Sequence, residues 1–138
     1  MKKLILLIVI TITISGCSNS DDPFEQYPQT HDITFNVSSS ESRQSSIDFQ
    51  ILGGDIEKEF HSFSDDHLPL SRIYRNQKVN YQTGLLITYR DVSKVQVGVD
   101  FEPYTVTLTI RVDSEIVATN EFIVDESGLV DYVEYKFL

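Results

Sequence analysis

The chain reads T-V-T-L-T-I-R-V from Thr105 to Val112, so that polar and apolar side chains alternate along the whole stretch. A period of two places one set of side chains on each face of a β-strand. β-Branched residues such as valine, isoleucine and threonine fit a half-buried pleated surface. This stretch therefore predicts a strand with one face in a core, and it indicates the fold class of the rest of the chain.

Similar short alternating runs precede and follow this stretch, separated by turn residues at intervals of about 8 to 12 residues. Gly53-Gly54 predicts a tight hairpin turn, because two glycines tolerate positive φ angles. The segment after it, Asp55 to Phe63, fits either a helix or a strand, and the preceding turn favours a strand. Pro69 predicts that residues 68–75 form an edge segment, because proline cannot donate to a strand ladder. Further strands are expected at residues 33–37, 47–51, 79–81, 85–89, 95–99, 115–124 and 133–137.

No amphipathic helix of about ten residues is evident between these runs. The sequence therefore predicts an all-β domain, an antiparallel β-sandwich with about seven to nine strands of the immunoglobulin-like or transthyretin-like kind. The expected division of the chain is a leader at residues 1–16, a flexible tether at residues 17–30 and a sandwich at residues 31–138.

The start of the chain has the layout of a bacterial secretory signal. Lys2 and Lys3 are followed by an apolar run from Leu4 to Ile14 and then by small residues. This order of charged, apolar and small segments is typical of a cleaved leader. A membrane-spanning helix is the alternative, but it needs about 20 apolar residues, and this run is shorter.

The end of this leader, Ile14-Ser15-Gly16-Cys17, resembles the lipobox of bacterial lipoproteins. The resemblance implies cleavage after Gly16 and a diacylglyceryl group on the sulfur of Cys17. Two acyl chains hold a protein stably at a membrane, whereas one chain holds it only marginally. The first partner expected for this protein is therefore a membrane, reached through the lipid on Cys17.

The polar and acidic run after the cysteine, Ser18 to Asp22, resembles the signal that exports lipoproteins of Bacteroidota-type bacteria to the outer face of the outer membrane. The resemblance implies a lipid-anchored protein of the outer membrane displayed at the cell surface. A solvated acidic linker on a protein held at the periplasmic face is the alternative.

A second resemblance concerns the domain itself. Residues 68–72 (L-P-L-S-R), 106–113 (V-T-L-T-I-R-V-D) and 117–118 (V-A) are similar to small mycobacterial-type membrane proteins that have an immunoglobulin-like or transthyretin-like sandwich. Those proteins accompany large exporters of lipids and siderophores. The resemblance implies the same sandwich architecture.

The charge and the cysteine content exclude several classes of function. The formal net charge is −10, and it becomes −12 once Lys2 and Lys3 leave with the leader. An acidic chain lacks the basic face that binding to nucleic acid requires. Cys17 is the only cysteine. With its sulfur acylated, the domain has no disulfide, no thiolate metal ligand and no cysteine nucleophile.

One local cluster could bind a metal ion, because it combines imidazole and carboxylate ligands. Its members are His61, Asp65, Asp66 and His67. Their spacing matches no motif of known mechanism, so solvated loop residues are the favoured interpretation, and no metal or other cofactor is expected.

The sequence predicts no enzyme, because it contains no Gly-x-Ser-x-Gly element and no other catalytic motif. We expect a non-catalytic envelope lipoprotein that acts as a binding or accessory module, with an envelope protein or a glycan as partner. The alternative is a structural or assembly subunit of an export or surface complex. Most tyrosines and phenylalanines sit at alternating strand positions, which favours a location in the core. The alternative is a platform of exposed tyrosines that binds a sugar or a protein, because tyrosine is favoured at interfaces. Its candidate members are Tyr74, Tyr81, Tyr89 and Tyr104.

Overall fold

The computed structural model describes residues 23–53, 58–64, 68–94 and 100–138. Within these ranges the chain forms one short 3-10 helix and eight strands. In chain order they are η1 (Pro23–Gln26), β1 (Gln29–Ser39), β2 (Ser45–Leu52), β3 (Lys58–Ser64), β4 (Leu70–Val79), β5 (Gly84–Asp91), β6 (Tyr104–Val112), β7 (Glu115–Val124) and β8 (Val130–Lys136).

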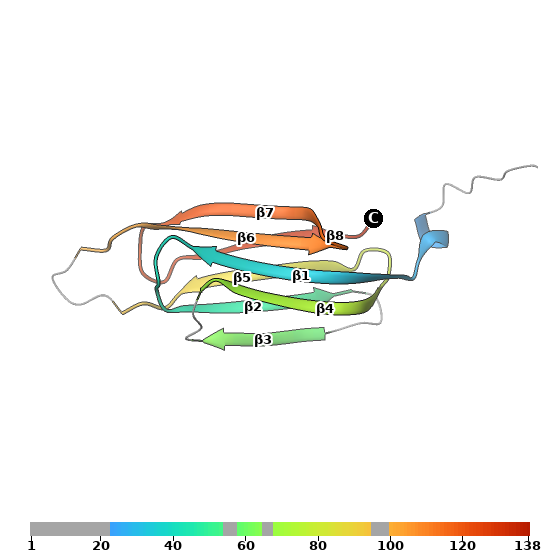
Figure 1. Cartoon of the computed structure of the whole chain (residues 1–138), viewed down its shortest axis with the longest axis horizontal. Helices are drawn as coiled ribbons and strands as arrows, with labels where there is room; N and C mark the ends of the chain where they lie inside the picture. The colour runs from blue at the N-terminus through green and yellow to red at the C-terminus, as the bar shows by residue number, and fades with distance from the viewer. Residues whose placement is uncertain (1–22, 54–57, 65–67, 95–99) are drawn as a thin grey trace, which may run out of the picture.

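The strands form two four-stranded sheets packed face to face (Figure 1). The strand order is β4-β1-β6-β7 in the first sheet and β3-β2-β5-β8 in the second. Every neighbouring pair is antiparallel. The predicted all-β antiparallel sandwich is therefore confirmed.

The core lies between the sheets and is built from the alternating positions of the central strands. On β6, five residues at every second position are buried, from Tyr104 to Val112. Phe35 of β1 stacks on Phe49 of β2 with ring centroids 5.0 Å apart, which joins the two sheets at their middle. Offset-stacked aromatic pairs add about 0.5 to 1.5 kcal/mol beyond the area that they bury.

The hairpin predicted at the two glycines is present as a pair of strands. β2 pairs with β3, with Ile51 opposite Lys58, so the strand interpretation of this segment is confirmed. Gly53 has a φ of +115°, and a Cβ built on it would lie 3.0 Å from the carbonyl oxygen of Gln82. Only glycine fits both conditions without strain. Gly54 lies outside the described residues.

The sequence prediction was wrong about β4. An edge segment at residues 68–75 and a separate strand at residues 79–81 were expected, but one continuous edge strand runs from Leu70 to Val79. A β-bulge interrupts its alternation, because Arg75 and Asn76 together oppose the single residue Asp32 of β1. Asn76 has a φ of 54°, and its backbone N–H donates to the Asp32 carboxylate over 2.8 Å. The strand expected at residues 95–99 lies outside the described residues.

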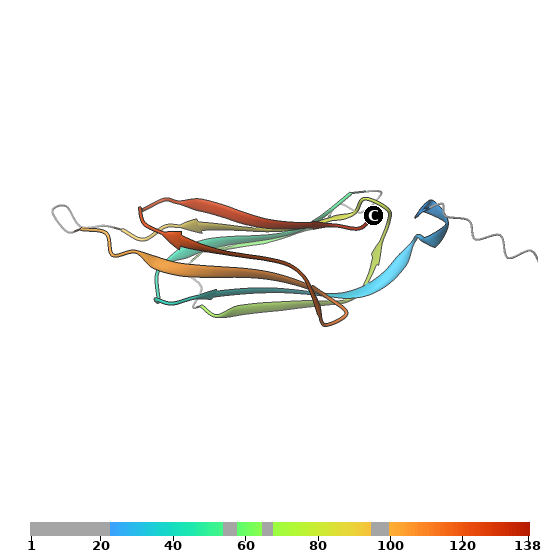
Figure 2. The ribbon, with the colours of Figure 1, turned by 90° about the horizontal axis from the view of Figure 1, so that it is seen from above.

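Regular structure begins before His31, the predicted start of the domain. β1 starts at Gln29, inside the range expected for the tether. Tyr27 packs edge-to-face against Tyr81 with ring centroids 6.0 Å apart, and its hydroxyl donates to the carbonyl of Leu138 over 3.3 Å. η1 and the C-terminus thus lie at the same end of the sandwich (Figure 2).

No helix in the described part of the chain is long and apolar enough to cross a membrane. Residues 1–22, which hold the predicted leader, Gly16 and Cys17, lie outside that part.

Candidate functional site

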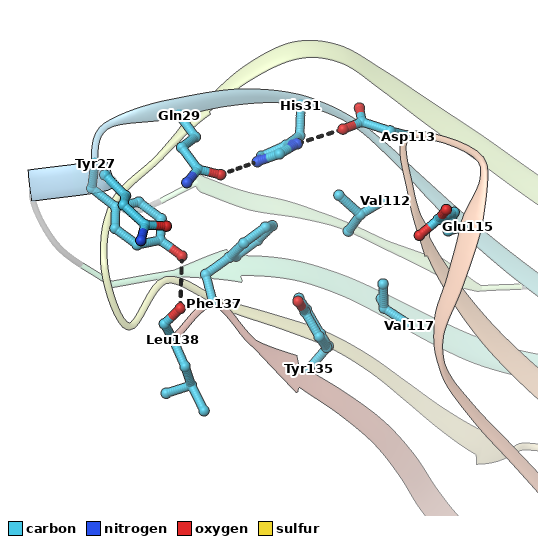
Figure 3. A pocket seen from close by; sticks show the side chains of 11 residues that line it. Tyr27, Gln29, His31, Val112, Asp113, Glu115, Val117, Tyr135, Phe137 and Leu138 are labelled. Atoms are coloured by element: carbon cyan, nitrogen blue, oxygen red, sulfur yellow. Dashed lines mark hydrogen bonds and ion pairs between the residues drawn. The ribbon is translucent and has the colours of Figure 1, made fainter. Parts of the chain in front are cut away.

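A hollow of about 490 Å³ opens at the end of the sandwich where η1 and the C-terminus lie (Figure 3). Strands β1, β6, β7 and β8 all contribute to it. Its lining combines aromatic rings, amides and carboxylates. The lining residues are Gln26, Tyr27, Gln29, His31, Val112, Asp113, Glu115, Val117, Tyr135, Phe137 and Leu138.

His31 is held by two oxygen atoms in this hollow. Its Nδ1 lies 2.6 Å from Oδ2 of Asp113, and its Nε2 lies 2.8 Å from Oε1 of Gln29. Both ring nitrogens therefore have a hydrogen-bonding partner. The ring also stacks on Phe137, with centroids 5.3 Å apart. Its orientation is therefore fixed on three sides.

Asp113 owes its position to the tight turn between β6 and β7. Asp113 and Ser114 have φ angles of 49° and 74°, as the two central residues of a type I′ turn do. Oδ1 of Asp113 accepts the backbone N–H of Asp32 over 2.9 Å, while Oδ2 faces His31. The hydrogen bond from His31, followed by that from the Asp32 backbone, lowers the pKa of Asp113 from its ordinary value. The carboxylate is therefore charged, and it joins the β6–β7 turn to β1.

The aromatic wall of the hollow comes from both ends of the described chain. Tyr135 meets Phe137 edge-to-face with ring centroids 5.2 Å apart. Tyr27 closes the side near η1, and burial, followed by the nearby Tyr135 and Tyr81 side chains, raises the pKa of its hydroxyl. A protonated phenol can both donate and accept, so this wall offers an apolar surface with a polar tip.

The lining of the hollow combines aromatic rings with a few hydrogen-bonding groups. A histidine paired with an aspartate can act as a base with its orienting acid, but hydrolysis by that route needs a nucleophile within reach. None of the described residues that line the hollow is a serine, threonine, cysteine or lysine. Rings beside a few polar groups are typical of small-molecule sites. The carboxylates of Asp113 and Glu115 favour neutral or cationic ligands over anionic ones.

A second polar cluster surrounds Asp91, which is 1% exposed and is the last residue of β5. This end of β5 lies at the opposite end of the sandwich (Figure 1). The carboxylate of Asp91 accepts from the Tyr104 hydroxyl over 2.8 Å, from Ser93 Oγ over 2.7 Å and from the Gly128 backbone over 3.2 Å. The hydroxyl of Tyr89 lies 2.8 Å from that of Tyr104. Burial and these hydrogen bonds raise the pKa of Tyr104. Asp91, Tyr89 and Tyr104 are buried, and their hydrogen bonds tie the β7–β8 turn to β5 and β6, which favours a structural role.

The site residues predicted from the sequence lie where the structure describes no side chains. Asp65, Asp66 and His67 lie outside the described residues, as Gly16 and Cys17 do, and His61 is on β3, where only the backbone is described. Among the residues that the structure describes, no three histidine, cysteine, aspartate or glutamate side chains group so as to hold a metal ion.

The alternative of a four-tyrosine platform was wrong. Tyr89 and Tyr104 are buried in the core, and Tyr74 is half-buried against Phe35. Tyr81 packs on Tyr27 instead of joining them. Their alternate strand positions already indicated a core location.

His31 was not among the predicted site residues. Its partner Asp113 is 82 positions away along the chain, and nothing local marks the pair. The one available signal was that Asp113-Ser114 occupies a turn, which places a polar side chain at the end of the sandwich.

Comparison with protein-family models, with curated proteins and with solved structures found no match for this chain.

Proposed function

We propose that this protein is a non-catalytic, lipid-anchored binding module of the bacterial cell envelope, and that its ligand occupies the hollow around His31. The observation that carries the proposal is the lining of the hollow: the rings of two tyrosines and one phenylalanine, the His31 imidazole, two glutamine amides and two carboxylates, without a serine, threonine, cysteine or lysine. This set suits a neutral or cationic polar ligand, such as an uncharged or amino-sugar glycan of the envelope. It disfavours phosphorylated and other anionic ligands, because the two carboxylates would repel them.

The expected anchor supports a location for this ligand. The described chain starts at Pro23, at the end of the sandwich where the hollow opens. A lipid on Cys17, only a few residues earlier, would turn this end toward the membrane. The ligand would then be a component close to the membrane surface, and the opposite end would face outward.

Titration of the full-length protein in detergent with neutral, amino-sugar and phosphorylated glycan fragments tests the proposal by calorimetry. We expect binding of a neutral or amino-sugar fragment and a loss of affinity of about tenfold in Glu115→Arg, which places a positive charge in the lining. Glu126→Arg, an exposed site at the opposite end, is the matched control and should bind like the wild type. Binding that Glu115→Arg leaves unchanged, or a preference for the phosphorylated fragments, would contradict the proposal.

A structural or assembly subunit is the second candidate function. The observation that favours it is the pair of oppositely charged strands at the two edges of the first sheet, Leu70–Val79 and Glu115–Val124.

A further inference from the structure

The first sheet ends in two strands of opposite charge. β4, at one edge, carries Arg72, Arg75 and Lys78 and no acidic residue. β7, at the other edge, carries Glu115 and Glu121 and no basic residue. A basic edge is notable in a chain whose formal net charge is −10. Edge strands offer unpaired backbone groups to other strands, and charged side chains decide which strands are accepted.

Two copies could join the edges of their first sheets in three combinations, β4 with β4, β7 with β7, or β4 with β7, and the charges distinguish between them. β4 against β4 would oppose basic side chains, and β7 against β7 would oppose acidic ones. Like charges placed opposite each other destabilise a strand pair, while opposite charges stabilise it. The β4–β7 combination is the one that the charges favour.

Exposed apolar side chains mark the same two edges. Ile73 of β4 is 57% exposed and Ile123 of β7 is 63% exposed. Ile73 pairs with Thr34 of β1, and Ile123 pairs with Thr105 of β6. Both isoleucines therefore lie on the outer face of the sheet, at its opposite edges. A long edge strand with exposed apolar residues and no lysine or proline, as β7 is, is a ready template for another strand.

The strand directions in the first sheet allow β7 of one copy to pair antiparallel with β4 of another. All neighbouring strands of the first sheet are antiparallel, and their number is even, so β4 and β7 run in opposite directions. A second copy displaced sideways along the sheet, without being inverted, brings its β4 antiparallel to the β7 of the first. Figure 1 shows these two strands along opposite sides of the molecule, with all strands following its longest axis.

We propose that β7 binds β4 of a second copy of this chain, in a head-to-tail contact that continues the first sheet. In one register, outer-face residues of β4 oppose outer-face residues of β7. This register sets Ile73 opposite Ile123 and Arg75 opposite Glu121. Both pairs then lie on the outer face, one apolar and one of opposite charge. On the inner face the same register sets Tyr74 opposite Phe122, two aromatic rings that are each packed at the margin of the core.

The bulge of β4 fits this register. Skipping Asn76, the extra residue of the bulge, sets Lys78 opposite Thr119 on the outer face and Val79 opposite Ala118 on the inner face. The contact ends before Val117. This residue is the extra one in a β-bulge, where the pairing of β7 with β6 shifts by one position. The contact uses no residue of the hollow, so it stands or falls independently of the proposed ligand site.

Cysteine cross-linking of the full-length protein in membranes tests the contact. Directly opposed residues of an antiparallel pair have Cα atoms about 4.5 to 5.5 Å apart, which a disulfide can span. We expect Ile73→Cys and Ile123→Cys in one chain to give a ladder of multimers on a non-reducing gel after mild oxidation. Mixing the two single variants should give dimers alone. The wild type, with Cys17 as its only cysteine, shows any background.

Charge reversal separates a specific contact from random collision. In the double-cysteine chain, Arg75→Glu or Glu121→Arg should each reduce the cross-linked fraction on the order of tenfold. A mixture of these two reversed chains should restore it, because every junction between them again joins opposite charges. The absence of a ladder, or a ladder that neither reversal weakens, would overturn the proposal. Melting curves of the single-residue variants show whether each remains folded.

Discussion

Individual contacts in this protein join positions that are far apart in the chain, and the pair of His31 and Asp113 is the clearest case. It holds the β6–β7 turn against β1 through an Nδ1–Oδ2 distance of 2.6 Å. Neither residue shows a local motif, so the sequence could not have revealed the pair. Asp91 is similar, because its acceptor role depends on Tyr104 and Gly128 meeting it in space. A sequence read residue by residue cannot locate such contacts before the strand order is known.

The His31–Asp113 contact predicts a pH dependence of stability. The pKa of Asp113 is lowered in the folded protein below its ordinary value of 3.8, mainly by the hydrogen bond from His31. Between these two pKa values the unfolded chain binds more protons than the folded one, so stability falls as the pH drops through this window. Above pH 3.8 the full contribution is present.

Urea unfolding from pH 6 down to pH 3 measures this effect. Asp113→Asn should lower the free energy of unfolding at pH 6 by about 0.2 to 1 kcal/mol, the range for solvent-exposed ion pairs. It should also flatten the loss of stability below pH 4 relative to the wild type. Asp125→Asn, exposed in the turn at the other end, is the matched control. If the free energies of unfolding of the wild type and of Asp113→Asn differ by the same amount down to pH 3, the charge of Asp113 does not contribute to stability.

Strands with one apolar and one polar face could be predicted from the sequence. β6 alternates without a break, and its buried positions follow the period of two that the sequence showed. β4 was divided wrongly because its bulge shifts the alternation by one residue at Asn76. A bulge depends on the partner strand, here on the Asp32 carboxylate that receives the extra N–H. Periodicity alone therefore locates regular strands but not the irregular edge of a sheet.

The hydrogen bond between Tyr104 of β6 and Asp91 of β5, at the end of the sandwich opposite the hollow, leads to a stability prediction. Tyr104→Phe removes one of the three groups that donate to the buried carboxylate of Asp91 and keeps the ring in the core. Leaving a buried acceptor short of a partner costs about 1 to 3 kcal/mol, so the free energy of unfolding should fall by that amount. Tyr132→Phe on β8, where the side chain is 56% exposed, is the control and should change stability little. Chemical denaturation at neutral pH compares the two, and equal effects would mean that the Asp91 cluster is not a stabilising tie.

At the scale of the whole molecule, the two ends of the sandwich are unlike each other. One end holds η1, the C-terminus and the hollow, and the other holds the turn braced by Asp91 (Figures 1 and 2). The proposed lipid on Cys17 would add a direction to this asymmetry, because it joins the chain at the end with the hollow. The charged edges of the first sheet run along the sides, so a sideways contact between copies would leave both ends accessible.

The lipid itself is the prediction on which this orientation depends. Intact-mass spectrometry of the membrane-extracted protein should show a chain that starts at Cys17 and carries at least two acyl chains. Cys17→Ala should lose the membrane-bound fraction almost completely, because each buried methylene contributes about 0.8 kcal/mol and no other anchor is expected. The folded sandwich should be unaffected, which circular dichroism of the released protein checks. If Cys17→Ala stays in the membrane fraction after a high-salt wash, or the sulfur is found unmodified, the hollow has no fixed orientation to the membrane. The argument for a ligand at the membrane surface then fails, while the binding properties of the hollow stand unchanged.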